Sequence, residues 1–373
     1  MIKAFLPLIT LWLSTFSLLQ AQLISIPDGG VNQKCWAGQR VGVSDIEVRW
    51  NAPGVKGREG KIWGTPVAHF GFTNLGFGAA TSAPWRAGAN ECTVISFSTD
   101  VMVEGKPLPA GRYGFFIALY PDSCTLIFSK NDAGWGTYFY KPEEDALRVT
   151  VRQQKNLAQS REWLAYTFSS PTKNSIVLAL EWERWRIPFT VSVDYEQTTL
   201  ASLRRQLSGG MGFDPPSLQA AAQWCLNNQV NYAEALGWAT MATDPNLGAQ
   251  ETFAALSTRA GLERALGKNA EADKSMQAAI AHAGIMDLHG YGRQLIEDKK
   301  YNEALSIFQA NYGKHNGAWP THVGLARGYS ATGDLKKALE HARLALAQAP
   351  DDLNRKNLES MIETLSAGKP IAQ

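Results

Sequence analysis

The sequence predicts a multidomain β + α protein: an N-terminal antiparallel β-sandwich followed by an all-α solenoid of stacked helical hairpins. Residues from about 25 to 195 form short runs of β-branched and aromatic residues, separated by Gly, Pro, Asn and Asp. From Leu200 onward, Ala, Leu, Gln and Glu recur at helical spacing. The segment Lys336–Leu339 resembles Asn302–Leu305 and lies 34 residues after it. Repeats with this period are typical of stacked helical hairpins.

Composition supports two folded domains. A chain of 373 residues exceeds one ordinary core, and its 45% hydrophobic and 19% charged residues describe a folded protein. A net charge of +2 gives no electrostatic reason to expect nucleic acid or an anionic membrane as partner. Strands and helices do not alternate, which disfavours nucleotide-binding folds.

The N-terminus has the pattern of a signal peptide. Lys3 supplies a positive charge, Ala4–Leu19 is largely apolar, and Ala21 is a small residue suited to cleavage. We predict a signal peptide at 1–21, with an uncleaved anchor as the alternative. The apolar run is short for a membrane span, and no other segment is a candidate. We therefore expect an exported protein, periplasmic or associated with the cell envelope, with no membrane span in the mature chain.

Turn-forming residues set the expected boundaries. The β domain is predicted at 22–197, with strands at 93–97, 114–119, 125–128, 147–151, 176–182 and 189–195. Gly209–Gly212 predicts a linker at 198–213. Asp214, followed by two prolines, has the pattern of a helix start. Helical repeats are expected at 214–350, and a capping helix with a tail at 351–373.

Residues 319–350 resemble a tetratricopeptide repeat, because characteristic residues stand at that family's spacings: Leu325, Tyr329, Gly333, Ala338, Ala342, Ala345 and Pro350. Similar units precede it at 285–318, 253–284 and 216–245. The alternative is an irregular helical bundle. The resemblance implies peptide binding along the first helix of each unit.

That geometry places Arg293 and Arg327 at equivalent positions, with Arg264 and His289 nearby. This basic track is suited to acidic side chains or a C-terminal carboxylate of a protein partner. A merely solvated face is the alternative.

The first half contains long, unusual motifs: Gln39–Gly42, Pro53–Arg58, Ile62–Gly64, Ala83–Glu91, Phe97–Val101, Gly105–Tyr113, Phe128–Lys130, Trp135–Gly136 and Leu147–Val149. In order and spacing they resemble the secreted bacterial family called domain of unknown function 2911, found mostly in Bacteroidetes-type bacteria. The resemblance covers about residues 25 to 195. It implies secretion and a β-rich domain, and it implies no reaction.

Two of the four cysteines depart from that family's pattern. Cys92 replaces an Ala-like residue and Cys124 replaces a frequent Trp, which would suit facing neighbours. The resemblance therefore implies a disulfide between Cys92 and Cys124; two separate buried thiols are the alternative. No C-x-x-C pair is present.

The densest polar and aromatic cluster is Trp85, Arg86, Asn90 and Glu91, a candidate ligand site. Glu91 is a candidate general base if burial raises its pKa. The alternative is structural, an Arg–Glu pair and an Asn beside a Trp that fills the sandwich. Metal-binding spacings are missing, and we expect neither metal nor cofactor.

Twelve Trp residues, eight of them in the β half, raise the question of sugar stacking. Strand alternation marks Trp182–Arg186 as the best surface candidate, with Trp182 and Arg184 on one face and Trp185 on the other. We expect non-enzymatic binding or scaffolding, with the solenoid engaging a protein. The alternative is a glycan-binding or glycan-hydrolysing β domain with the solenoid as adaptor.

Overall fold

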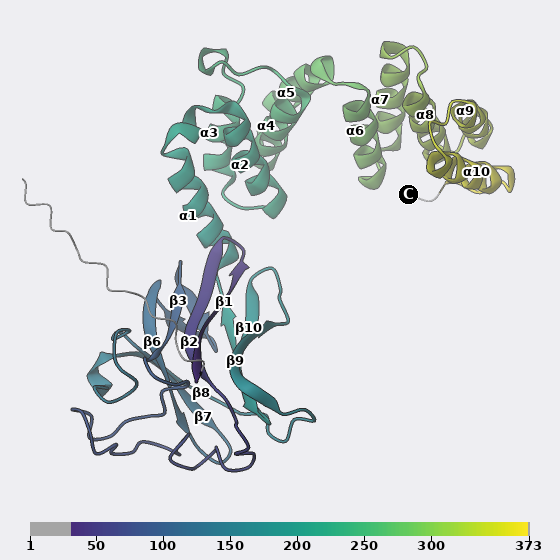
Figure 1. Ribbon diagram of the computed structural model, residues 1–373. Helices are drawn as coiled ribbons and strands as arrows, with labels where there is room; N and C mark the ends of the chain where they lie inside the picture. Colours follow the sequence, from purple (N-terminus) through teal and green to yellow (C-terminus); the bar gives the residue numbers. More distant parts are fainter. Residues whose placement is uncertain (1–30, 372–373) are drawn as a thin grey trace, which may run out of the picture. The chain divides into compact units, whose positions relative to one another are not determined.

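The computed structural model describes residues 31–371, so the predicted signal peptide at 1–21 lies outside the described part. The chain divides into two compact units between Tyr195 and Glu196. Figure 1 shows strands in the first unit and helices in the second, which confirms the predicted fold class.

Antiparallel pairing organises the N-terminal unit into two sheets. The first has the order β1-β2-β3-β6-β7-β8 and the second the order β5-β4-β11-β10-β9. The strands are β1 Asn32–Val41, β2 Ser44–Pro53, β3 Thr93–Phe97, β4 Val101–Val103, β5 Lys106–Leu108, β6 Gly111–Leu119, β7 Cys124–Ser129, β8 Asp145–Val151, β9 Arg161–Ser169, β10 Ser175–Glu183 and β11 Trp185–Ser192.

The two sheets share one core. On β10, Ile176, Leu178 and Leu180 alternate towards the interior and are fully buried. Phe115 of β6 stacks on Phe189 of β11 with ring centroids 5.7 Å apart, so aromatic rings of both sheets meet in this core.

A second apolar cluster covers the other face of the six-stranded sheet. It contains Phe116 and Ala118 of β6, Ile127 of β7, and Cys92 and Tyr140 from adjoining loops. Strands β6 and β7 are therefore buried on both faces, which explains why β6 is an almost continuous apolar run.

Helical hairpins make up most of the C-terminal unit. Successive helices pair as α2 with α3, α4 with α5, α6 with α7, and α8 with α9, and α10 packs on α9. The bounds are α1 Tyr195–Leu207, α2 Pro215–Asn228, α3 Tyr232–Met241, α4 Phe253–Ala265, α5 Asn269–His282, α6 Ile285–Glu297, α7 Tyr301–Lys314, α8 Trp319–Ala331, α9 Leu335–Ala347 and α10 Asp352–Ser366.

Local sequence explains where these helices begin and end. The Asp214 carboxylate accepts a hydrogen bond from the backbone N–H of Ser217 at 2.9 Å, and Pro215 occupies the first turn of α2. The turn between α8 and α9 contains Gly333 at φ +88°, a left-handed conformation that glycine adopts without strain. Ala338 and Ala345 are fully buried, as small residues at helix contacts should be.

One predicted boundary is wrong. Residues 198–207, expected to belong to a linker, are part of α1. The physical reason is burial: Leu200 is 4% exposed and packs with Ala222 and Cys225 of α2, which stabilises a helix that its own sequence only weakly favours. Within residues 31–371, no helix is both long and apolar enough to cross a bilayer.

Candidate functional site

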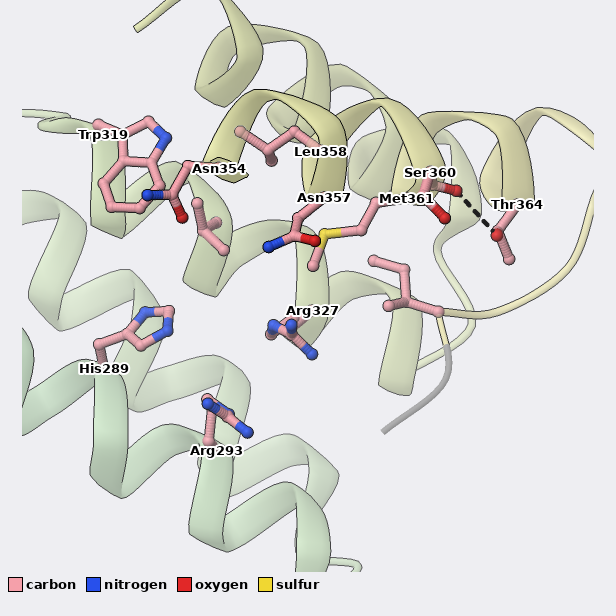
Figure 2. A pocket seen from close by; sticks show the side chains of 12 residues that line it. His289, Arg293, Trp319, Arg327, Asn354, Asn357, Leu358, Ser360, Met361 and Thr364 are labelled. Carbon is pink, nitrogen blue, oxygen red and sulfur yellow. Dashed lines mark hydrogen bonds between the residues drawn. The ribbon is translucent and has the colours of Figure 1, made fainter. Parts of the chain in front are cut away.

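A cavity of about 500 Å³ lies among α6, α8 and α10 (Figure 2). The first helices of two successive hairpins form one side, and the capping helix forms the other. Its polar and aromatic lining includes His289, Arg293, Trp319, Arg327, Asn354 and Asn357. Three of the four residues predicted for the basic track, His289, Arg293 and Arg327, are thus brought into one pocket.

Helical spacing explains why these side chains converge. His289 and Arg293 are four residues apart on α6, and Val323 and Arg327 are four apart on α8, so each pair shares one helix face. Because α6 and α8 pack against each other, the two faces meet. Figure 2 shows Arg293 and Arg327 entering the same space from two different helices.

The pocket carries uncompensated positive charge. Within the described chain, Arg293 and Arg327 form no ion pair, and no Asp or Glu lines the cavity. Burial lowers the pKa of Arg327, and repulsion from Arg293 lowers it further. An arginine still remains protonated at neutral pH. Two guanidinium groups that repel each other in a partly desolvated pocket favour an anionic ligand.

His289 contributes as a neutral side chain. Its Nδ1 lies 3.1 Å from the Pro320 carbonyl oxygen, which can only accept, so Nδ1 carries the hydrogen. Burial lowers the pKa of His289, the Pro320 hydrogen bond opposes this, and the charges of Arg327 and Arg293 lower it again.

The remaining lining offers hydrogen bonds and apolar contact. The indole N–H of Trp319 is buried and has no hydrogen-bond partner among residues 31–371. Asn357 is exposed on α10, with an amide able to donate and accept. Val323, Leu358 and Met361 supply an apolar wall. Positive charge, an unused donor and an apolar wall together match a carboxylate next to an apolar side chain.

Arg264 does not belong to this pocket. Its guanidinium forms an ion pair with Asp273 at 2.6 Å, both side chains being well exposed. Sequence spacing predicted that Arg264 would lie near Arg293 and Arg327. In the structure it pairs instead with Asp273 of α5.

The four residues predicted as a ligand site in the β domain do not line one cavity: Glu91 lines a different cavity from Trp85, Arg86 and Asn90. Trp85 is 4% exposed and stacks on Trp182 in the core. Arg86 donates to the Asn90 carbonyl oxygen at 3.0 Å and lies over the Tyr138 ring. Trp85, Arg86 and Asn90 line a cavity of about 280 Å³.

Glu91 points away from that cavity, so the Arg86–Glu91 pair considered from the sequence does not form. Its carboxylate accepts from Lys34 Nζ at 3.0 Å and from Asn51 Nδ2 at 2.7 Å. Burial raises the pKa of Glu91, but hydrogen bonds from its own backbone, Lys34 and Asn51 outweigh this and lower it. The condition for a general base, a pKa raised by burial, is therefore not met.

The predicted surface segment Trp182–Arg186 is wrong as a stacking platform. Trp182 is 1% exposed, and both Trp182 and Trp185 contact Trp63, at 5.8 and 4.5 Å between ring centroids. Strand alternation fails here because Glu183 has a left-handed φ of +51° in the β10–β11 turn. The most exposed tryptophan of the described chain is Trp36, on edge strand β1, which strand alternation alone does not distinguish from the buried tryptophans.

The disulfide expected between Cys92 and Cys124 is not formed; both thiols are free. Cys92 belongs to the apolar cluster on the outer face of the six-stranded sheet, whereas Cys124 belongs to the core between the sheets. A sheet separates them. No group of three His, Cys, Asp or Glu within residues 31–371 is arranged to hold a metal ion.

We predict that the buried thiols react slowly in the native protein. Burial raises the pKa of Cys92 to about 11 and that of Cys124 to about 12, so at pH 8 only about one Cys92 thiol in a thousand is ionised. An aromatic disulfide reagent should modify the partly exposed Cys35 first. In denaturant without reductant it should titrate four thiols. A titration of two would contradict the separation of Cys92 from Cys124.

Comparisons with known proteins agree with this division. Residues 32–191 match the family model described as "Protein of unknown function (DUF2911)", and residues 295–362 match a tetratricopeptide-repeat model. Both resemblances predicted from the sequence are confirmed. No curated protein matches the chain significantly.

Two solved structures illustrate the similarity. MamA from residue 41 to its end, from Desulfovibrio magneticus RS-1, has 18% identity and a TM-score of 0.27, covering 43% of this chain and 95% of that one. A tetratricopeptide repeat protein from Parabacteroides merdae ATCC 43184 has 18% identity and a TM-score of 0.30, covering 46% and 69%. Residues 32–191 are thus similar to the DUF2911 family, and residues 295–362 are similar to tetratricopeptide repeats.

Proposed function

We propose that this protein is an exported, non-enzymatic scaffold of the cell envelope whose helical repeats bind a carboxylate-bearing peptide segment of a partner protein. The tetratricopeptide match and the stacked hairpins support the scaffold role, since such stacks present an extended binding surface. The ligand class rests on one observation: Arg293 and Arg327 share a cavity in which the described chain supplies no acid.

A carboxylate is the ligand group that satisfies this cavity best. Guanidinium groups bind carboxylates through paired, charge-assisted hydrogen bonds. The Trp319 N–H is a further donor, and Asn354 and Asn357 supply amides at the side of the pocket formed by α10. Leu358 and Met361 would contact the apolar side chain beside the carboxylate.

Export is supported by the first residues of the sequence. Lys3, the apolar stretch Ala4–Leu19 and Ala21 have the order of a signal peptide, and the proposed mature protein starts at Gln22. The carboxylate ligand would then belong to another protein outside the cytosol.

A selection experiment tests the proposal. The wild-type protein should enrich peptides with an Asp, a Glu or a free C-terminus from a library displayed with free C-termini. Each charge-assisted contact contributes about 1.5–3 kcal/mol, so the double variant Arg293→Ala/Arg327→Ala should lose at least about 100-fold in affinity. Arg343→Ala removes an exposed arginine of α9 outside the pocket and should bind as wild type.

The proposal fails if the double variant enriches the same peptides as wild type. It also fails if the enriched peptides share no carboxylate. Circular dichroism of each variant confirms that the helices remain folded.

A further inference from the structure

A second cavity, of about 560 Å³, lies on the outer face of the six-stranded sheet at its β1 edge. Its lining includes Lys34, Trp36, Glu47, Arg49, Asn51 and Glu91. It belongs to the β domain and is independent of the function proposed for the helical repeats.

Strand register brings these side chains to one face. Trp36 of β1 pairs with Arg49 of β2, and Lys34 pairs with Asn51, so the four form two adjacent rows. Their neighbours on β2, Val48 and Trp50, point into the core. The outer face of β1 and β2 therefore combines one aromatic ring with a set of polar groups.

Trp36 supplies a flat apolar surface open to solvent. Its side chain is 75% exposed. The next residue on the same face of β1 is Gly38, which pairs with Glu47 of β2 and adds no side chain to this face. Single exposed tryptophans are common on protein surfaces, and the polar groups beside Trp36 distinguish this face from such isolated positions.

The charged groups beside Trp36 are neutralised in pairs. Lys34 and Glu91 form an ion pair at 3.0 Å, and Arg49 and Glu47 form one at 2.5 Å. Asn51 Nδ2 donates a hydrogen bond to the second carboxylate oxygen of Glu91 at 2.7 Å. The charges balance, so the surface has no excess charge with which to select an ionic ligand.

One buried acceptor remains unused. Asn51 is 5% exposed, and its Oδ1 has no hydrogen-bond partner among residues 31–371. A buried polar atom without a partner is costly and calls for an external donor. A hydroxyl group is a neutral donor that suits it.

We propose that this cavity binds a neutral polysaccharide. A pyranose ring has an apolar C–H face that stacks on an aromatic ring, and hydroxyl groups around its rim that bond to carboxylate, amide and guanidinium groups. Trp36 is the stacking platform, and Glu91, Asn51 and Arg49 bind the hydroxyl groups. The pairing of Lys34 with Glu91 and of Arg49 with Glu47 leaves no net positive charge to attract a polyanion.

Affinity electrophoresis tests this site. The full-length mature chain is run through native gels containing soluble xyloglucan, galactomannan, mixed-linkage β-glucan or dextran. We expect at least one of them to retard the wild type, Trp36→Ala to weaken that affinity at least tenfold, and Trp36→Phe to retain part of it. Trp135→Ala removes another exposed tryptophan, 54% exposed and outside the cavity, and should run as wild type.

Three results would overturn the proposal. They are no retardation by any of the four polysaccharides, equal retardation of Trp36→Ala and wild type, or loss of a protein partner by Trp36→Ala with polysaccharide binding intact. The last would make this face a protein-docking surface. None depends on Arg293 or Arg327, so the test is separate from that of the helical pocket.

Discussion

Phe308→Ala should destabilise the C-terminal helices by about 3–5 kcal/mol, the usual cost of deleting a buried aromatic ring. Phe308 is fully buried on α7. Its ring contacts Gly292 of α6 and Gly324 and Gly328 of α8 so closely that a Cβ at these positions would lie 2.4, 2.5 and 2.9 Å from it. The ring thus fills the space where three helices approach, and its loss leaves a cavity that rigid helices cannot close.

Hydrogen exchange followed by mass spectrometry is the suitable measurement, because it reports each unit of the chain separately. Peptides from α6 to α8 should exchange faster in Phe308→Ala, and those from the β-sandwich should not change. Phe213→Ala is the matched control, since Phe213 is 76% exposed in the same unit. Unchanged exchange in α6 to α8 would contradict this packing.

Trp182→Ala should destabilise the β-sandwich by a similar amount, about 3–5 kcal/mol. Trp182 is 1% exposed and stacks on Trp85 with ring centroids 6.2 Å apart. Its indole N–H donates to the Glu162 carbonyl oxygen at 3.3 Å. The substitution removes the ring contacts and one of the two hydrogen bonds to that carbonyl, which still accepts from the Val55 backbone N–H at 2.8 Å.

Guanidinium unfolding, with hydrogen exchange to identify the unit that unfolds, measures this effect. The β-sandwich transition should shift to lower denaturant, and Trp135→Ala should move it by less than about 0.5 kcal/mol, as a surface change does. A stability of the β-sandwich equal to wild type would show that the tryptophan cluster is not a structural core.

The helical half was the more predictable part of the fold. A repeat of 34 residues fixes which positions on successive hairpins are equivalent, so Arg293 and Arg327 were expected together and do line one pocket. The contribution of α10 to that pocket was not predictable, because Asn357 and Met361 lie beyond the last repeat recognised in the sequence, at 319–350. Arg264 was wrongly predicted to lie near this pocket, because the spacing of residues along a helix does not show that an acid on another helix, here Asp273, pairs with the arginine.

For the β domain, the sequence predicted the fold class but not the arrangement of the candidate site residues. Glu91 stands five residues after Arg86, yet left-handed residues at Ala87 and Asn90 turn the chain between them. Glu91 then meets Lys34, which is 57 residues away in sequence. Such pairings depend on strand register, which a single sequence does not provide. The same holds for Cys92 and Cys124. Without the strand register, the sequence does not show whether two residues lie on the same face of a sheet or on opposite faces.

Calorimetry with one selected peptide measures whether Arg293 and Arg327 bind a carboxylate. The peptide is compared with its C-terminal amide and with a form in which Asp and Glu are replaced by Asn and Gln. We predict that one of these changes weakens binding to wild type at least tenfold and has little effect on Arg293→Ala/Arg327→Ala, which already binds weakly. Equal affinity of wild type for all three peptides would show that Arg293 and Arg327 do not bind a carboxylate.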